Sequence, residues 1–335
     1  MQLSYAQRLE DFHLDLAFGA QATGTYVDIG AGHPVADNVS YWFYLKGWNG
    51  LVVEPQRAIL DLYCHLRPRD IAVCCLVGDR EGDADFHVVE RLHGFSTTIA
   101  DHARMAAQFG ARFETVRMPM RTLSSLLAEH DIQSIDFLKV DVEGAEAAVL
   151  AGMDWRTYRP RIVLVEATTP GSMAEAWREW EPLLLEKGYR FVLYDDLNRF
   201  YVAEEETELA QRLPRTPVSW DSAQHLYDCG RALDQPDHPD HQLARELTKA
   251  FLAALPTLDS SLLADLLSAR PGMRSLEAEA MMGLLFGSAE FPGPQPQPPA
   301  EDDSLARLRE LVASDRFRAA LGRIAAAYDG GHIMD

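Results

Sequence analysis

Residues 25–55 contain the feature that most restricts how this chain can fold. A short apolar segment from Tyr26 to Ile29 runs directly into Gly30-Ala31-Gly32, and a second apolar segment, 51–53, ends on Glu54. Strand, glycine turn, helix, strand and acid is the order found in nucleotide-type cofactor sites. Glycine permits a tight turn and a close backbone approach, and the acid can bind ribose hydroxyls. The pattern alone fits nicotinamide, flavin or S-adenosylmethionine.

Composition narrows the class of protein. At 335 residues and 47% hydrophobic content, the chain can form one large domain or a domain with an accessory region. A net charge of −20 argues against nucleic-acid partners, which require a positive surface. No segment approaches the ~18 apolar residues of a membrane span, and no signal peptide is evident. Four cysteines without metal-site spacing fit a reducing compartment, so we expect a cytoplasmic protein.

Apolar periodicity and turn residues predict alternating strands and helices over the first 205 residues. The expected strands are 25–29, 50–53, 71–77, 84–89, 135–140, 161–166, 189–194 and 200–203. The expected helices are 4–18, 38–46, 57–66, 122–129, 145–151 and 172–187. The stretch 91–118 is less regular, and we expect a loop and short helix there, crossing the mouth of the site.

The last two expected strands decide between fold families. They are separated only by residues 195–199, and so short a loop joins antiparallel strands, since a parallel crossover needs a dozen or more residues. A mostly parallel sheet closed by an antiparallel hairpin is unlike a dinucleotide-binding dehydrogenase. It is like a class I methyltransferase, so the expected fold is α/β and Rossmann-like.

The C-terminal third has a different character. Residues 206–287 are expected to form an α-helical extension, because 242–287 show helical apolar periodicity, with leucines such as Leu243 and Leu247 expected in core or oligomer contacts. Residues 288–303 form a proline-rich segment that predicts an extended linker, and 304–335 predict a last helix, roughly 304–328, and a tail. We expect an α-helical C-terminal region through which the chain could form a homo-oligomer.

The first ~205 residues resemble the FkbM family of S-adenosylmethionine-dependent methyltransferases. The stretches that carry this resemblance are SYAQRLED (4–11), YVDIGAGHPVADNVSYWFYLKGWNGLVVEP (26–55), IDFLKVDVEGAEAAVLAGM (135–153), IVLVEATTP (162–170) and GYRFVLYDDLNRFYVAEE (188–205). The resemblance implies a methyltransferase domain at 1–205 and O-methylation of a hydroxyl on a sugar, a polysaccharide precursor or a related secondary metabolite.

Four positions are the main candidates for holding S-adenosylmethionine. Gly30 and Gly32 would let the backbone approach its methionine and ribose portions. Glu54 would accept both ribose hydroxyls, because a carboxylate takes two hydrogen bonds at once. Asp141 ends a strand and would contact the methionine amino end or the reacting centre.

Three further cofactor candidates have strong structural alternatives. Asp28 would bind the amino group or order the glycine loop. Asp79 follows the third expected strand and would accept from the adenine amino group, unless it is an exposed turn acid. Gln7 belongs to the family-like SYAQRLED stretch and would close over the cofactor, unless it lies on the helix surface.

A sugar hydroxyl is a poor nucleophile at neutral pH and benefits from a general base or a metal. We favour Glu143 and Glu166 as the substrate-facing pair, with helix N-terminal charge and loop anchoring as their structural alternatives. His33 is a third base candidate, and an equally plausible loop-packing residue. Asp141, Glu143 and Glu166 could instead hold a divalent cation that binds a substrate diol; the spacing permits a metal without requiring one.

Two other functions compete with methyl transfer. A nicotinamide oxidoreductase or nucleotide-sugar enzyme is disfavoured by the hairpin and by the lack of a third glycine at the expected position. A non-catalytic, cofactor-binding interaction protein is disfavoured by the intact Gly30, Gly32, Glu54 and Asp141. Acceptor specificity is expected from residues 84–118 and from the C-terminal helices.

Overall fold

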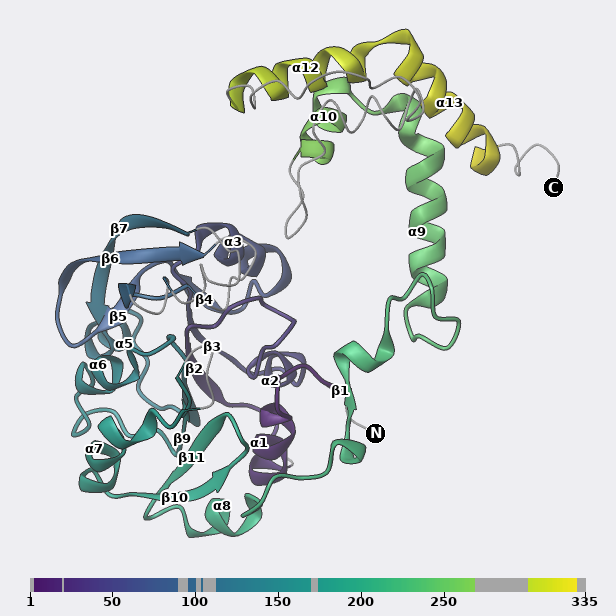
Figure 1. Ribbon diagram of the computed structural model, residues 1–335. Coiled ribbons are helices and arrows are strands. Elements are labelled where there is room, and N and C mark those ends of the chain that lie inside the picture. The colour runs from purple at the N-terminus through teal and green to yellow at the C-terminus, as the bar shows by residue number, and fades with distance from the viewer. Residues whose placement is uncertain are drawn as a thin grey trace. The chain divides into compact units, whose positions relative to one another are not determined.

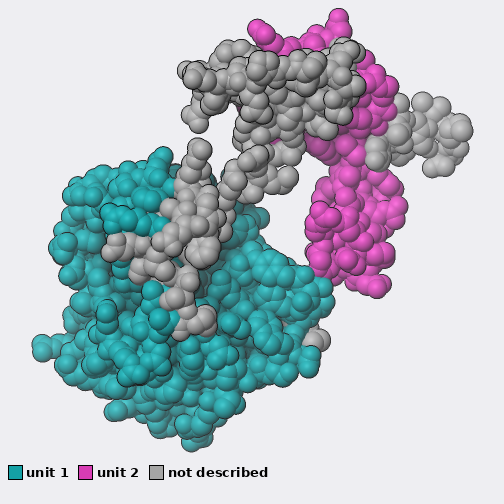
Figure 2. Space-filling view, viewed as in Figure 1, with its two compact units in different colours: residues 1–228 teal, residues 229–335 magenta. Residues whose placement is uncertain are grey.

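The computed structural model describes residues 3–19, 21–89, 96–100, 104, 113–169, 174–268 and 301–329. The chain divides into two compact units, Met1–Asp228 and Cys229–Asp335 (Figure 2). The first unit ends later than the boundary expected at 205. Its last part is held by α8 (Thr207–Arg212), which packs on α1 (Glu10–Phe18), and by β12 (Gln224–His225), which pairs with β1 (Leu3–Ser4).

A seven-stranded sheet forms the centre of the first unit (Figure 1). Its strand order is β10-β11-β9-β8-β2-β3-β4. The strands span β2 (Thr25–Ile29), β3 (Asn49–Val53), β4 (Ile71–Val73), β8 (Phe137–Val140), β9 (Ile162–Glu166), β10 (Tyr189–Tyr194) and β11 (Asn198–Ala203). β11 runs antiparallel to both β9 and β10, and the other pairings are parallel. The sheet is therefore mostly parallel, as expected.

Helices cover both faces of this sheet, so its strands are apolar on both sides. One core joins Val27 and Ile29 of β2 to α5 (Leu123–Glu129), α6 (Glu146–Ala151) and α7 (Glu181–Glu186). The opposite core joins Tyr26 and Phe137 to α1, α2 (Tyr41–Leu45), α3 (Arg57–Leu66) and α8. Figure 1 shows these two sets of helices on either side of the sheet. The result is a three-layer α/β/α unit.

A second, three-stranded sheet lies between β4 and β8 in the chain. It has the order β5-β7-β6 and consists of β5 (Leu76–Gly78), β6 (Gly82–Val89) and β7 (Phe113–Thr122). The expected single strand 71–77 is therefore wrong, because the chain changes sheets after Val73. The expected irregular segment is wrong for 113–118, which belong to β7, while 90–95, 101–103 and 105–112 lie outside the described residues.

Three expected helices are shorter than the apolar pattern suggested, and one of them, 38–46, is reduced to α2. The first begins at Glu10, because the Asp11 carboxylate accepts hydrogen bonds from the Ser4 hydroxyl (2.6 Å) and the Tyr5 amide (2.7 Å), which keeps those residues out of the helix. The expected helix 172–187 is a 3-10 turn, η2 (Trp177–Glu179), followed by α7; residues 170–173 lie outside the described part. A proline in the first turn of α7 starts this second helix.

The second unit is helical in its described residues. It begins at the last residue of η4 (Leu226–Cys229) and contains α9 (His241–Ala254), η5 (Leu255–Thr257), α10 (Ser260–Ser268), α12 (Glu301–Ala313) and α13 (Asp315–Asp329). α13 packs on α9 and α10 packs on α12 around a small core that includes Leu263, Val312 and Phe317. Leu243 and Leu247 are exposed, so of the two expected roles the core position is wrong and the oligomer contact stays a prediction.

The expected last helix is interrupted. The Ser314 hydroxyl accepts a hydrogen bond from the Phe317 amide (3.2 Å), which caps a new helix, so 304–328 falls in α12 and α13. Of the expected linker 288–303, residues 301–303 open α12 and the rest lies outside the described residues. Within the described parts of the chain, none of the helices has the length and apolar character needed to cross a bilayer.

Candidate functional site

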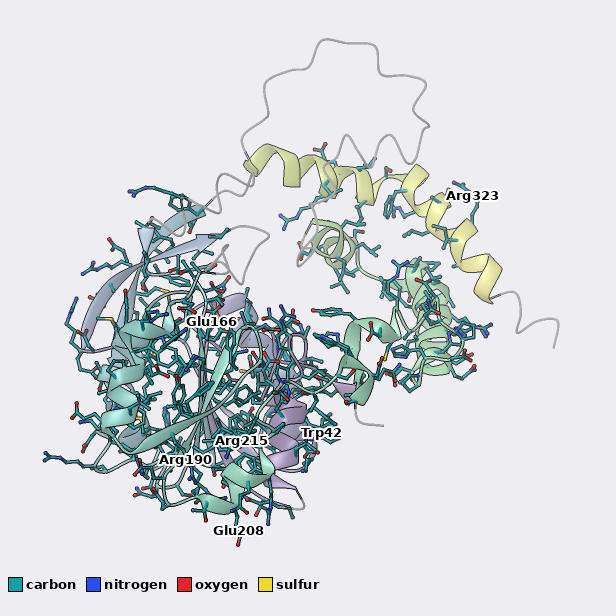
Figure 3. The ribbon with its side chains drawn as sticks, turned by 60° about the horizontal axis from the view of Figure 1, so that its bottom comes forward. Trp42, Glu166, Arg190, Glu208, Arg215 and Arg323 are labelled. Carbon is teal, nitrogen blue, oxygen red and sulfur yellow. The ribbon has the colours of Figure 1, made fainter. Side chains whose placement is uncertain are left out.

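The candidate site lies at the carboxyl edge of the large sheet. The chain passes from β2 outward through β3 to β4, and later returns to β8 on the other side of β2. Ligands in open α/β sheets bind at such a switch in strand order, outside the carboxyl ends of the strands. Here those ends carry Gly30 after β2, Glu54 after β3, Asp141 after β8 and Glu166 at the end of β9. Glu166 is labelled in Figure 3.

The two positions after β2 are occupied by glycine for different structural reasons. Gly30 has φ +73, and a Cβ there would lie 1.7 Å from the backbone oxygen of Asp141, so only glycine lets these two chain segments approach. Gly32 has φ +60, and a Cβ there would meet nothing within 4 Å. Gly30 therefore serves the packing of β2 against β8, while Gly32 leaves open space in front of the loop.

Glu54 is buried and fastens the glycine loop. Its carboxyl group is 4% exposed; Oε2 accepts the Gly32 amide (3.0 Å) and Oε1 accepts the Gln56 amide (2.8 Å). Burial raises the pKa of Glu54. The Gln56 side chain also donates a hydrogen bond to this carboxylate, so Gln56 and Gly32 together hold Glu54 in place.

Lys139, in the middle of β8, connects the two strands at the switch point. Its Nζ lies 3.2 Å from Asp141 Oδ2 and 3.7 Å from Asp28 Oδ1, and it donates to the backbone oxygen of Gly30 (3.2 Å). Burial alone would lower the pKa of Lys139, but these two carboxylates outweigh it and raise the pKa. The sequence analysis missed Lys139, although a lysine inside the apolar run 135–140 was a signal for a buried charge.

Asp28 is fully buried beneath the glycine loop. Its Oδ2 accepts the Ser40 hydroxyl (2.6 Å), and its Oδ1 lies near Lys139. These contacts fit a role in ordering the loop, one of the two alternatives that the sequence left open.

A tight turn between β8 and α6 presents the second acid. Glu143 has φ 57 and Gly144 has φ 103, both in the left-handed region. The Glu146 carboxylate stabilises the turn by accepting the Val142 amide (3.2 Å) and the Gly144 amide (3.0 Å). The Thr97 hydroxyl donates to the Glu143 backbone oxygen (2.8 Å). The turn is thus held from both sides.

Three carboxylates meet at this edge. One carboxylate oxygen from each of Asp141, Glu143 and Glu166 lies within 4.8 Å of the other two. Burial raises the pKa values of Glu143 and Glu166 well above their ordinary range, and repulsion from the neighbouring carboxylates adds to this. Glu166 is 7% exposed, and its Oε2 has no hydrogen-bond partner among the described residues. The structure therefore brings together the trio that the sequence proposed.

Two further buried acids, Glu10 of α1 and Asp195 of the β10–β11 hairpin, are joined by one asparagine. The Asn198 side chain donates to Glu10 (2.8 Å), and its backbone amide donates to Asp195 (2.6 Å). Asn198 is also the register partner of Glu166 in the neighbouring strand. Burial raises the pKa values of Glu10 and Asp195. The sequence analysis missed this contact between α1 and the hairpin, because the two residues it joins are far apart in the chain.

His33 is exposed at the end of the glycine loop. Its Nδ1 accepts the backbone amides of Val35 (3.1 Å) and Ala36 (3.0 Å), and burial lowers its pKa. A nitrogen that accepts two amide hydrogens carries no proton, so in the neutral ring the proton lies on Nε2. His33 therefore offers the site a donor where a general base would have to accept.

Asp79 and Gln7 are both exposed, and neither directly follows a strand of the large sheet. Asp79 follows β5 in the second sheet, is exposed, and pairs with Arg80 (3.3 Å). The expected position beside the adenine required a single strand through residue 77, whereas β4 ends at Val73 and is followed by Cys74. Gln7 is exposed in the turn before α1.

Arg67, directly after α3, supports the loop from the protein interior. Its side chain is fully buried and pairs with Asp70 (2.6 Å). It donates to the Pro34 backbone oxygen (3.2 Å) and to the Asn38 side chain (2.9 Å), and Asn38 in turn donates to the Ala31 backbone oxygen (2.9 Å). The sequence analysis missed Arg67, because a cation after a helix is ordinarily a surface residue.

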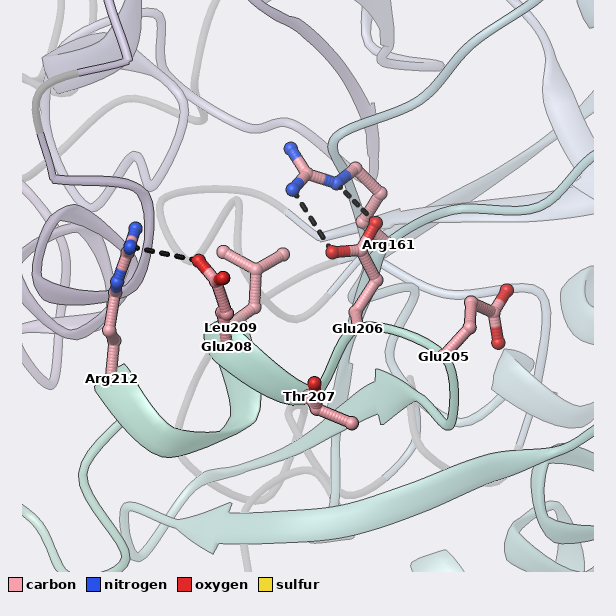
Figure 4. Close-up of a pocket in the computed structure, with 7 residues that line it drawn as sticks. All are labelled: Arg161, Glu205, Glu206, Thr207, Glu208, Leu209 and Arg212. Atoms are coloured by element: carbon pink, nitrogen blue, oxygen red, sulfur yellow. Dashed lines mark hydrogen bonds and ion pairs between the residues drawn. The ribbon is translucent and has the colours of Figure 1, made fainter.

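A hollow of about 270 Å³ lies elsewhere, against α8 (Figure 4). Its lining residues are Arg161, Glu205, Glu206, Thr207, Glu208, Leu209 and Arg212. Arg161 precedes β9, so the hollow is at the amino end of the strand whose carboxyl end carries Glu166. In Figure 3 Glu208 lies at the lower edge of the unit, and Glu166 lies well above it. Two of its lining residues, Arg161 and Glu206, form an ion pair (2.7 Å), so their charges already have a structural role.

Comparison with known proteins identifies one family. Residues 28–191 match the family model described as methyltransferase FkbM domain. No curated protein and no solved structure matches the chain. The matched segment begins in β2 and ends in β10, so it contains the glycine loop, Glu54, the turn after β8 and Glu166. This match confirms the resemblance that the sequence motifs indicated.

Proposed function

We propose, from the premise that residues 28–191 are an FkbM methyltransferase domain, that the chain transfers a methyl group from S-adenosylmethionine to a hydroxyl oxygen. The proposed acceptor is a sugar, a polysaccharide precursor or a related secondary metabolite. One observation carries the proposal beyond the family: Glu54, Gly32, Asp141 and Glu166 converge at the switch point of the sheet.

The strand order supports this cofactor over a nicotinamide. β11 is inserted antiparallel between β9 and β10, at the end of an otherwise parallel sheet. This is the arrangement of class I methyltransferases, whereas the dinucleotide-binding sheet has the order 3-2-1-4-5-6 with all strands parallel. This strand order therefore disfavours the alternative of a nicotinamide enzyme.

The residues at the edge fit the parts of S-adenosylmethionine. The Glu54 carboxylate would accept the ribose hydroxyls, and the open space at Gly32 admits the ligand next to the backbone. Asp141, with its partner Lys139, would bind the amino-acid end. When bound, the cofactor supplies an activated methyl group on a sulfonium. Asp28 orders the loop through Ser40 and Lys139.

Methyl transfer needs positioning and a partly deprotonated acceptor. Holding the two reactants in line at a water-poor edge supplies much of the rate. Burial raises the pKa values of Glu143 and Glu166, which makes either carboxylate a stronger base than an exposed glutamate. We assign the substrate-facing role to this pair. His33 is left out of it, because its Nδ1 already accepts two amides.

Calorimetric titration with S-adenosylmethionine tests the assignment. Glu54→Gln keeps the shape of the side chain but removes its charge and half of its acceptor capacity, so we expect binding weakened about 10-fold or more. Glu186→Gln, an exposed glutamate of α7, is the matched control and should bind like the wild type. Equal affinities of the two variants would refute the ribose assignment, and a wild type that binds NADH but no S-adenosylmethionine would refute the function.

Methyl transfer itself is tested with labelled cofactor. The full chain is incubated with S-adenosylmethionine carrying a labelled methyl group and with glycan or metabolite fractions. We expect label in a hydroxyl-bearing product and none with Glu166→Gln. Cofactor binding without transfer to any fraction would favour the non-catalytic alternative.

A further inference from the structure

The three carboxylates of Asp141, Glu143 and Glu166 form a concentrated negative site. Their oxygens come from the ends of two adjacent strands, β8 and β9, and lie within 4.8 Å of one another. Oxygens bound to one magnesium ion at about 2.1 Å lie about 3 to 4 Å apart in an octahedron. Small side-chain rotations would therefore bring all three onto a single ion.

A second observation concerns Glu166 alone. The residue is more than nine-tenths buried, and its Oε2 is shielded from solvent without a hydrogen-bond partner among the described residues. An unsatisfied buried acceptor costs about 1–3 kcal/mol, and more when it is charged, so such a group in a native site calls for a partner beyond the described residues, and a bound cation is one such partner. This unpartnered oxygen therefore belongs to one of the three clustered carboxylates.

Lys139 pairs with one member of the trio and shares its charge with an aspartate outside it. Lys139 pairs with Asp141 at 3.2 Å, but the same Nζ also lies 3.7 Å from Asp28 and donates to Gly30. One positive charge is thus shared between two aspartates before either glutamate is considered. The second acidic neighbour, Glu146, uses one carboxylate oxygen for backbone amides and adds further negative charge.

We propose that Asp141, Glu143 and Glu166 bind one divalent cation of the oxygen-preferring class, Mg²⁺ or Mn²⁺. Three carboxylate ligands without histidine or cysteine suit these ions better than zinc or copper. An octahedral ion with three protein ligands keeps positions for water or for substrate hydroxyls. With the ion bound, Glu143 and Glu166 would face the substrate as metal ligands, and the ion would replace a free carboxylate base in activating the acceptor hydroxyl. That role rests on the proposed methyl transfer, whereas the binding site itself does not.

Electron paramagnetic resonance with Mn²⁺ tests the site directly, because bound Mn²⁺ loses the sharp signal of the free ion. The full chain, freed of metal with EDTA and dialysed, is titrated with MnCl₂ with and without S-adenosylmethionine. We expect one saturable site in the wild type and at least 10-fold weaker binding in Glu143→Gln and in Glu166→Gln. Glu186→Gln, in α7, serves as the matched control and should bind like the wild type.

Two results would overturn the inference. The first is a wild type without a saturable Mn²⁺ site, which would mean that protons neutralise the trio. The second is unchanged Mn²⁺ affinity in either glutamine variant that shows wild-type tryptophan fluorescence. Calorimetry with S-adenosylmethionine on the same samples separates the two hypotheses: cofactor binding without Mn²⁺ sinks the metal site alone, and Mn²⁺ binding without cofactor binding sinks the methyltransferase assignment alone.

Discussion

Replacing Arg67 by methionine removes the cation from a polar cluster that has no access to solvent. The Arg67 and Asp70 side chains are both 0% exposed and lie 2.6 Å apart. Arg67 also donates to the Asn38 side chain (2.9 Å) and to the Ser40 hydroxyl (2.9 Å), both of which support the glycine loop. Methionine has a similar length and packs well, so the variant tests the charge more than the volume.

The magnitude follows from what the substitution leaves behind. Asp70 keeps donors in the Tyr26 hydroxyl (2.6 Å) and the Gly50 amide (3.2 Å), but no cation. Breaking a buried ion pair from one side costs about 3–5 kcal/mol. For a unit of this size 1 kcal/mol moves Tm by about 2–4 °C, so we expect a fall of roughly 6–20 °C.

Arg57→Met is the matched control. Arg57 pairs with Asp61 in the same helix, but the two side chains are 75% and 54% exposed. An exposed i, i+4 pair contributes only about 0.3–0.5 kcal/mol, so this variant should melt within about 2 °C of the wild type.

Tryptophan fluorescence is the appropriate assay, because all six tryptophans lie in residues 1–228 and report on the first unit. Thermal melts should show the first unit of Arg67→Met unfolding well below that of Arg57→Met. S-adenosylmethionine affinity, measured below both transitions, should also fall in Arg67→Met, since the loop loses its support. Melting curves of the two variants that coincide would refute the view that Arg67 stabilises this unit.

The remaining predictions use single positions. His13 is buried with Nε2 accepting the Val218 amide (3.1 Å), and burial lowers its pKa from 6.5 to about 4. The unfolded chain therefore takes up the proton first, and the stability present above pH 6.5 falls by about 3 kcal/mol as the pH drops through 4. His13→Gln should remove this part of the pH dependence in urea titrations, and an unchanged profile would contradict it. Gly30→Ala should destabilise the first unit, because its Cβ would strike the Asp141 backbone oxygen. Gly32→Ala should cost only about 1–2 kcal/mol for its φ of +60, yet weaken cofactor binding; a Gly30→Ala protein with wild-type Tm would refute the packing argument.

Local pattern was sufficient where one segment formed one element. α3 spans 57–66 as predicted, because its amphipathic periodicity is uninterrupted. β2, β3, β8 and β9 lie within a residue or two of their predicted bounds, because each is a short apolar run with both faces covered. The run 71–77 failed, since an apolar sequence does not reveal that the chain leaves one sheet after Val73 and joins another at Leu76.

The same distinction holds for the site: local rules predicted some of its residues and missed those that depend on burial. Asp141 and Glu166, placed by the rule that strand ends converge, lie together at the carboxyl edge of the sheet, and Glu54 follows β3 at the same edge. Asp79 was assigned by the same rule applied to a misjudged strand, and it lies in the second sheet. Lys139 and Arg67 were missed because their importance comes from burial, and the hydrophobic pattern of a single segment does not show which charged residue is enclosed by others.

The left-handed residues show how the edge is built. Gly30, Gly32, Glu143 and Gly144 all have positive φ, and they occupy the two loops on either side of the switch point. Glutamate in this conformation costs free energy, of order 1 kcal/mol or more, that the surroundings must offset. Glu146 offsets part of it at the turn's amides.

Thr97 provides the other part, by donating to the Glu143 backbone oxygen. Thr97 also pairs with His87 of β6, so this hydrogen bond joins the second sheet to the turn that carries Glu143. The sequence analysis expected acceptor specificity in residues 84–118. The hydrogen bond from Thr97 connects that region to the turn of Glu143, which we propose faces the substrate. A methyl acceptor that shifts β6 on binding would therefore change how Glu143 is held. Specificity and chemistry would then be coupled through the backbone of one strained residue.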